Sequence, residues 1–435
     1  MTPGARVSAA IEVLSDVEGR RRPVQDALKD WGLSHRFAGS GDRAAIGDLV
    51  YDALRRRRSN AWAAEDDSAR AAVLANVEPE AARGWVGDRH APEIGEGELV
   101  SAERRTARLT DAPDWVRGDY PEWLAPAMAR AFGEAAAEEG AGLAERPPTD
   151  LRANRLKTTR DELLGKLAQH PVLSRAGAGA LVPGRFSPDA IRLAPSVDVR
   201  RFAPTATAEF LHGGYEIQDE GSQLAALLSG ARPGWQVGDL CAGAGGKTLA
   251  LAALQANQGQ IFAHDVDARR LAKADERLRR AGVRTVQLRF PKAGALDELA
   301  GKLDLAFVDA PCTGSGTWRR NPDAKWRLRP NALEMRRREQ AEALALAAPT
   351  VRPGGRLVYV TCSVLREEND DQIAAFLADR PEFRPLPPAE AVRAAAPAVA
   401  DALPARAQVR DHGLQFTPRL TGTDGFYVAV LERGR

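Results

Sequence analysis

The chain has 435 residues, of which 44% are hydrophobic and 28% charged, and its formal net charge is +2. This length exceeds what one hydrophobic core usually supports, so we expect two or three domains. No uncharged apolar stretch is long enough to cross a bilayer, and the amino-terminal segment lacks the apolar core of a signal peptide. We therefore expect a cytoplasmic protein with no membrane partner.

The three cysteines lie far apart, and no C-x-x-C or H-x-x-x-H spacing accompanies them. Three thiols cannot all pair, which argues against a disulfide framework, and the spacing does not fit a zinc site. We expect reduced thiols, no bound metal and a monomer.

Residues 1–145 are predicted to form a helical domain, because apolar residues recur at helical spacing over 9–14 and 46–54. The composition changes near Pro147-Pro148, where a strand over 151–157 leads into a helix capped at Thr159. Residues 146–216 are assigned to a small α/β module.

From Ile217 onward, strands alternate with helical stretches, which is typical of a doubly wound, mainly parallel sheet. The third domain therefore spans 217–435. The stretch 385–406, rich in Ala and Pro, interrupts this pattern and is predicted to be a surface excursion. Residues 424–430 are predicted to form the closing strand.

Within this third domain, two cysteines each follow an apolar, strand-like run: Cys312 comes after 303–308 and Cys362 after 356–360. In an open parallel sheet, ligands bind outside the carboxyl ends of the strands. A free cysteine is often only a small buried hydrophobic residue. Two at equivalent strand ends favour nucleophilic catalysis instead.

A glycine-rich loop, Cys241 to Thr248, follows a predicted strand over 237–240. A P-loop would need Gly at 241 and a dinucleotide fingerprint would need Gly at 248, so both interpretations fail. The next strand, 260–264, ends in Asp265, whose carboxylate can accept hydrogen bonds from ribose hydroxyls. S-adenosylmethionine fits this pattern because it needs no phosphate cradle.

A basic strip follows the Cys312 turn and is interleaved with Trp318 and Trp326. Such charge runs are usually solvated faces. Next to the predicted site, however, cations with aromatic neighbours suit a nucleic-acid backbone and stacked bases. The candidate phosphate-binding residues are Arg319, Arg320, Lys325 and Arg327.

Taken together, these motifs resemble the RsmB/Sun/NSUN-type RNA cytosine-5 methyltransferases. The resemblance covers nearly all of residues 217–377 and is weaker over 150–216. It rests on Gln218-Asp219-Glu220-Gly221-Ser222-Gln223, the loop from Cys241 to Thr248, Asp309-Ala310-Pro311-Cys312-Thr313-Gly314, residues 319–326, Pro353-Gly354-Gly355 and residues 361–369.

The resemblance implies a Rossmann-like class I methyltransferase domain, preceded by a small α/β RNA-recognition module and a NusB-like RNA-binding helical domain. It implies that Cys362 is the nucleophile and that Cys312 assists release of the covalent product. It also implies RNA as the partner, with ribosomal RNA of the small subunit as the expected substrate. The implied S-adenosylmethionine contacts are Cys241, Ala242, Gly243, Ala244, Gly245, Gly246, Lys247, Asp265 and Asp309.

Two departures from the family pattern bear on the cofactor. Where many relatives carry Gly-Asp after the third strand, residues 286–291 contain no carboxylate. The loop has Ala242-Gly243-Ala244-Gly245 where relatives usually have Ala-Ala-Pro-Gly, which predicts a less rigid loop.

Three alternatives remain open at this stage: the same chemistry on transfer RNA, an oxidoreductase built on a similar sheet, and a noncatalytic RNA-binding assembly factor. The oxidoreductase lacks its dinucleotide fingerprint. The assembly factor would be favoured by loss of Cys362 or Asp265, and both residues are present.

Overall fold

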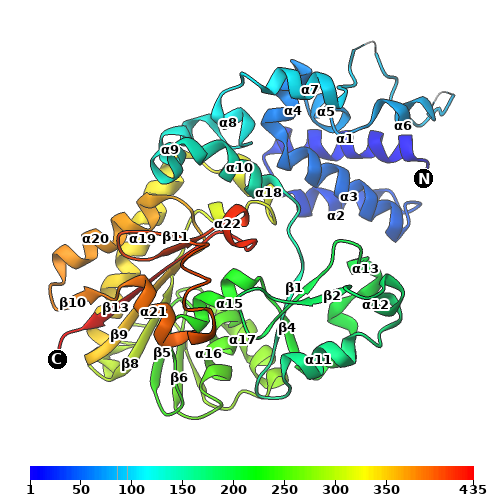
Figure 1. Ribbon diagram of the computed structural model, residues 1–435. Helices are drawn as coiled ribbons and strands as arrows, with labels where there is room; N and C mark the ends of the chain where they lie inside the picture. The colour runs from blue at the N-terminus through cyan, green and yellow to red at the C-terminus, as the bar shows by residue number, and fades with distance from the viewer. Residues whose placement is uncertain (86, 96) are drawn as a thin grey trace. The chain divides into compact units, whose positions relative to one another are not determined.

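A computed structural model describes residues 1–85, 87–95 and 97–435 (Figure 1). Its internal contacts divide the chain into two compact units. The first comprises Met1–Arg146 with Thr317–Pro330, and the second comprises Pro147–Gly316 with Asn331–Arg435. Over the described residues, no helix combines the length and apolar character needed to cross a membrane.

The first unit is helical. Its core joins the apolar faces of successive helices through residues such as Leu14, Ile46 and Leu74, all fully buried. Side-chain caps start several of its helices: Thr2 and Ser68, for example, each accept a hydrogen bond from a backbone N–H in the first turn. The helices of residues 1–146 are α1 (Pro3–Arg20), α2 (Val24–Ser34), α3 (Ser40–Arg55), α4 (Arg57–Ala64), α5 (Ala69–Leu74), α6 (Pro79–Arg83), α7 (Ala102–Leu109), α8 (Asp114–Arg117), α9 (Ala125–Phe132) and α10 (Ala136–Ala144).

The segment Thr317–Pro330 packs with this helical unit, although the sequence places it inside the third domain. It carries α18 (Pro322–Arg327). Trp326 Nε1 donates to the Leu54 carbonyl at 2.6 Å, and Lys325 Nζ donates to the Arg55 carbonyl at 3.1 Å. These bonds fix α18 at the carboxyl end of α3.

The second unit begins with a small antiparallel sheet in the order β2-β3-β1-β4. Thr159 and Glu162 form a capping box at the start of α11, as the sequence predicts. The strands are β1 (Asp150–Ala153), β2 (Leu181–Pro183), β3 (Ala190–Leu193) and β4 (Tyr215–Ile217), and the helices are α11 (Arg160–Leu167), α12 (Pro171–Ala176), α13 (Val199–Phe202) and α14 (Ala208–Leu211).

A nine-stranded sheet follows, in the order β11-β12-β13-β9-β8-β5-β6-β7, with β10 also paired to β13. Strands β7, β6, β5, β8 and β9 run parallel, whereas β13 joins β9 antiparallel. The strands are β5 (Gln236–Asp239), β6 (Gln260–His264), β7 (Val286–Arg289), β8 (Leu303–Asp309), β9 (Val351–Thr361), β10 (Phe383–Pro385), β11 (Gln408–Val409), β12 (Leu414–Phe416) and β13 (Phe426–Arg433).

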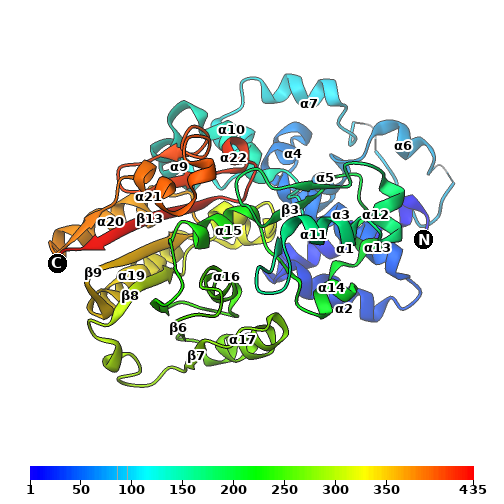
Figure 2. The ribbon, with the colours of Figure 1, turned by 60° about the horizontal axis from the view of Figure 1, so that its bottom comes forward.

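Helices cover both faces of this sheet (Figures 1 and 2). In β9, Val358 and Val360 pack into the cluster shared with α15 and α16, whereas Leu357 and Tyr359 pack into the cluster shared with α19 and α20. This alternation explains why the central strands are apolar throughout, since both faces are buried. The helices are α15 (Glu220–Leu227), α16 (Gly246–Leu254), α17 (Ala268–Ala281), α19 (Pro330–Ala347), α20 (Asp370–Asp379), α21 (Pro388–Ala395) and α22 (Pro418–Thr421).

The predicted surface excursion over 385–406 is wrong for part of its length. It contains α21, and Val392 and Leu403 are fully buried in the cluster that also holds Val358. The composition of Ala and Pro misled the prediction, because the apolar residues are few and widely spaced.

Candidate active site

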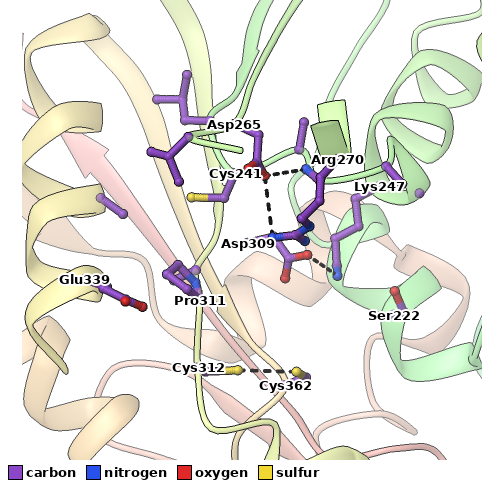
Figure 3. A pocket seen from close by; sticks show the side chains of 18 of the residues that line it. Ser222, Cys241, Lys247, Asp265, Arg270, Asp309, Pro311, Cys312, Glu339 and Cys362 are labelled. Carbon is purple, nitrogen blue, oxygen red and sulfur yellow. Dashed lines mark hydrogen bonds and ion pairs between the residues drawn. The ribbon is translucent and has the colours of Figure 1, made fainter. Parts of the chain in front are cut away.

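The parallel register of β8 and β9 brings the two predicted catalytic cysteines together. Asp309, the last residue of β8, lies opposite Val360, so both strands end at the same edge of the sheet. The Sγ atoms of Cys312 and Cys362 lie 3.3 Å apart (Figure 3). The hydrogen bond with Cys362, followed by burial, raises the pKa of the Cys312 thiol well above its usual range. Cys312 therefore retains its proton, and its sulfur lies within hydrogen-bonding distance of the Cys362 sulfur.

Both cysteines line a cavity of about 1000 Å³ at this edge of the sheet. Most of the predicted cofactor contacts line it too. They are Cys241, Ala242, Gly243, Ala244, Gly246, Lys247, Asp265 and Asp309. Gly245 instead starts α16 from the left-handed conformation, with φ of +81°. A Cβ at Gly245 would lie 2.9 Å from Ala274 Cβ, which explains the need for glycine.

Asp265 holds the glycine loop in place at the end of β6. Its Oδ2 accepts a hydrogen bond from Gly243 N at 2.7 Å, and its Oδ1 accepts one from Asp267 N at 2.8 Å. Gly243 has φ of +54°, a conformation that favours glycine. The carboxylate is 3% exposed and keeps further lone pairs for a ligand, since each oxygen accepts more than one hydrogen bond.

Lys247 and Asp309, which both line the cavity, form an ion pair in which Nζ lies 2.6 Å from Oδ2. Burial acts to lower the pKa of Lys247, but the charge of Asp309, its hydrogen bond to the ammonium and the nearby Cys362 and Asp239 together raise that pKa. The ammonium also lies 5.0 Å from the centroid of the Phe426 ring. Lys247 thus remains a cation beside the cysteine pair.

The third cysteine has a different character. Burial raises the pKa of Cys241 far above its usual value, with the nearby charge of Asp309 adding to the effect. A thiol that stays protonated is a poor nucleophile. Cys241 therefore lines the cavity as a neutral thiol.

A buried carboxylate ties the two cysteine loops together, and the sequence analysis assigned it no role. Glu368 is fully buried. Its Oε1 accepts hydrogen bonds from Thr313 N at 2.8 Å and from Gln340 Nε2 at 3.0 Å. Its Oε2 accepts hydrogen bonds from the hydroxyls of Thr313 and Ser363, each at 2.5 Å. Thr313 follows Cys312 and Ser363 follows Cys362. The only sequence signal was that Glu368 lies in the 361–369 motif.

A second buried carboxylate, Asp239, lies at the end of β5 and is fully inaccessible to solvent. Its Oδ2 accepts a hydrogen bond from Thr248 Oγ1 at 2.6 Å, which joins the strand end to the first turn of α16. Burial raises the pKa of Asp239 to about 7. Sequence reasoning counted it only as part of a strand.

The four candidate phosphate-binding residues of the basic strip differ in how far their side chains are exposed. Arg319 is 3% exposed and Lys325 is 1% exposed, so the structure does not support direct phosphate contacts by these two side chains. Burial lowers the pKa of Lys325 to about 8, while the charge of Asp119 opposes that effect. Trp318 is likewise buried, at 1% exposure, and offers no stacking surface.

The other two cations differ from them. Arg320 is half-buried and Arg327 is exposed, with an ion pair of 3.1 Å between Arg327 and Asp323. None of the four predicted phosphate-binding residues lines the cavity described here.

No group of three or more His, Cys, Asp or Glu side chains arranged to hold a metal is found over the described ranges.

Comparisons with known proteins identify the family of the chain. Residues 227–432 match the model of the family described as 16S rRNA methyltransferase RsmB/F, and residues 120–200 match an RsmF/B-like, ferredoxin-like domain. The ribosomal RNA small subunit methyltransferase B of Shewanella oneidensis is 32% identical over 340 residues, which cover 78% of this chain and 73% of that protein. The chain belongs to the RsmB/F family of rRNA methyltransferases.

Further relatives extend the comparison. The probable ribosomal RNA small subunit methyltransferase B of Bacillus subtilis is 32% identical over 320 residues, covering 72% of this chain and 66% of that protein. A solved structure of a methyltransferase homologue from Pyrococcus horikoshii is 27% identical, with a TM-score of 0.58 over 74% of this chain and 97% of that one. The structure of NSun6 from the same organism with SFG shares the fold, at 21% identity and a TM-score of 0.58 over 72% of this chain and 98% of that one.

Proposed function

We propose that the protein transfers a methyl group from S-adenosylmethionine to carbon 5 of a cytosine in small-subunit ribosomal RNA, through a covalent bond between Cys362 and the base. The observation that carries this proposal is the pair of sulfur atoms 3.3 Å apart in the cavity that Asp265 also lines. Methylation of an exocyclic nitrogen would need neither thiol. The substrate follows the names of the relatives, which specify ribosomal RNA of the small subunit.

The residues present fit S-adenosylmethionine. Asp265 lies where ribose hydroxyls would be accepted, and the glycine loop allows close approach of a ligand to the backbone. Asp309 and Lys247 offer one charge of each sign, which suits the amino and carboxylate groups of the methionine part. The cofactor supplies an electrophilic methyl group when bound.

The two cysteines have different roles in the reaction of the cytosine. The Cys362 thiolate would add to carbon 6 of cytosine, which makes carbon 5 nucleophilic. Carbon 5 would then bond to the methyl carbon while the methyl–sulfur bond of the cofactor breaks and S-adenosylhomocysteine leaves. A base removes the proton from carbon 5, and the electron pair of that C–H bond restores the ring double bond and expels the Cys362 thiolate. Cys312, protonated and in contact with the Cys362 sulfur, assists this release.

Single-turnover assays with each cysteine replaced test this assignment. C362A should abolish transfer and leave S-adenosylmethionine binding within a few-fold, because the thiolate acts on the base. C312A should accumulate protein covalently attached to RNA, visible as a shifted band on denaturing gels. C241A is the matched control and should trap no RNA, since Cys241 lies in the cofactor loop. Substantial turnover by C362A would refute the nucleophile.

The substrate itself is tested by mapping 5-methylcytosine in total RNA from a strain that lacks the gene. Loss of a modified cytosine from small-subunit ribosomal RNA is the expected result. Loss confined to transfer RNA would favour that substrate, and no loss at all would favour the noncatalytic assembly factor.

A further inference from the structure

No carboxylate directly follows β7 (Val286–Arg289), the strand beside β6 and its Asp265. Four acidic side chains line the cavity: Asp265, Asp309, Glu339 and Glu342. None of these four residues comes directly after β7, because residues 286–291 contain no Asp or Glu. If an acidic group contacts the adenine, it has to come from elsewhere in the fold.

Three of these four carboxylates already have partners. Asp265 accepts two backbone N–H groups, and Asp309 is paired with Lys247. Glu339 is paired with Arg336 at 2.5 Å. Glu342 is exposed and, over the residues that the structure describes, makes no hydrogen bond or ion pair. Glu342 is therefore the carboxylate of these four whose oxygens are not engaged by other groups of the protein.

Helix α19 presents Glu342 beside an apolar wall. Residues 339, 342, 343 and 346 share one helical face, and all line the cavity. Figure 3 shows Glu339, on this face, across the cavity from Lys247. Gln340 Nε2 holds the helix to the loop after β8 by donating to the Pro311 carbonyl at 2.9 Å.

Two aliphatic side chains that line this cavity are exposed, and ligand pockets are lined predominantly by apolar side chains. Val266 is 82% exposed and directly follows the ribose-binding Asp265, and Leu346 on α19 is 41% exposed. An adenine ring is attached to the ribose, so it must lie near the residue next to Asp265. Apolar surfaces of this kind suit the faces of a flat aromatic ring.

We propose that the adenine of S-adenosylmethionine packs against Val266 and Leu346 and that its N6 amino group donates a hydrogen bond to Glu342. This inference rests on the proposed cofactor. In it, the carboxylate that contacts the adenine comes from α19, not from the residues after β7. The same carboxylate disfavours a purine with a carbonyl at position 6, because two acceptors would then face each other.

Calorimetry on the full-length protein with S-adenosylhomocysteine and its inosyl analogue tests the proposal. The inosyl analogue carries a carbonyl in place of the N6 amino group. Wild type should prefer the adenosyl ligand. E342A should bind it on the order of ten- to a hundredfold more weakly, the loss of a hydrogen bond to a charged group. E342Q should lose most of the preference, because an amide can either accept from an amino group or donate to a carbonyl.

Two control variants separate recognition from packing. E339Q removes a neighbouring carboxylate that is already paired with Arg336, so the preference for the adenosyl ligand should persist. L346A should weaken both ligands alike and leave their ratio unchanged, because it removes packing and no polar contact. Thermal unfolding of each variant checks the fold.

The outcomes are distinguishable from failure of the proposed function. If wild type binds neither ligand, the proposed cofactor is wrong. If wild type binds and both Glu342 variants match it in affinity and in ligand ratio, the cofactor stands and the Glu342 contact is overturned.

Discussion

Glu368 allows a prediction whose magnitude follows from its hydrogen bonds. Two of its four donors, Thr313 N and Gln340 Nε2, are N–H groups that cannot turn into acceptors. E368A leaves both without their acceptor, at a cost of about 1–3 kcal/mol each. We expect the free energy of unfolding to fall by about 2–6 kcal/mol, and the geometry of the cysteine pair to be lost with it.

E368Q is the matched control. Both N–H donors point at Oε1, so an amide oxygen can replace that atom, while the hydroxyls of Thr313 and Ser363 can rotate to accept from the amide nitrogen. An amide also avoids the cost of burying a charge, so E368Q should remain within about 1 kcal/mol of wild type. Urea denaturation measures both variants. Equal destabilisation by E368A and E368Q would refute the hydrogen-bond argument.

The rate of methyl transfer in a single turnover is a second measurement. A loss of folding stability alone would not change this rate while the protein stays folded. Assayed well below the unfolding midpoint, E368Q should transfer the methyl group at a rate near that of wild type, and E368A should be slower while still folded. A folded E368A with wild-type turnover would show that Glu368 has no influence on the placement of the thiols.

Three further predictions concern the cofactor, the RNA and pH. D265A should weaken S-adenosylmethionine binding by about 1.5–3 kcal/mol, measured by calorimetry, and unchanged affinity would contradict the ribose contact. Replacing Arg320 and Arg327 together by Gln should flatten the salt dependence of RNA binding by about 0.7 per lost phosphate contact, and parallel salt plots would reject their role. Burial raises the pKa of Asp239 from 3.8 to about 7, so the folded state favours the protonated carboxyl group. The stability that this protonated group contributes is lost as the pH rises from 3.8 to about 7. D239N should therefore lose less stability than wild type in urea titrations over the same interval, and identical pH profiles would argue against a buried, protonated Asp239.

Local patterns predicted the elements that carry the chemistry. The strand over 260–264 has the bounds expected. The strand before Cys312 extends the predicted run by one residue, and the strand before Cys362 extends it by six. These predictions succeeded because strands buried on both faces are apolar without interruption. The proximity of the two thiols also followed, since neighbouring parallel strands end at one edge. Glu368 was not predictable, because its partners Thr313 and Gln340 are distant in sequence. The position of Glu342 was not predictable either, because it lines the cavity only through the packing of α19.

The basic strip shows where charge patterning fails. Lys325 and Arg327 are two residues apart in one sequence run, yet the first is 1% exposed and the second is exposed. The difference arises because α18 packs against α3, where the ammonium of Lys325 reaches the Arg55 carbonyl and lies 4.7 Å from the centroid of the Trp326 ring. A buried cation of this kind is retained only where such contacts replace its water. Trp318, which suggested base stacking, is itself buried and its ring centroid lies 5.9 Å from the same ammonium, and Trp326 is half-buried. K325A should destabilise the helical unit and leave the salt dependence of RNA binding unchanged, whereas a flattened slope in a folded K325A would restore the original interpretation.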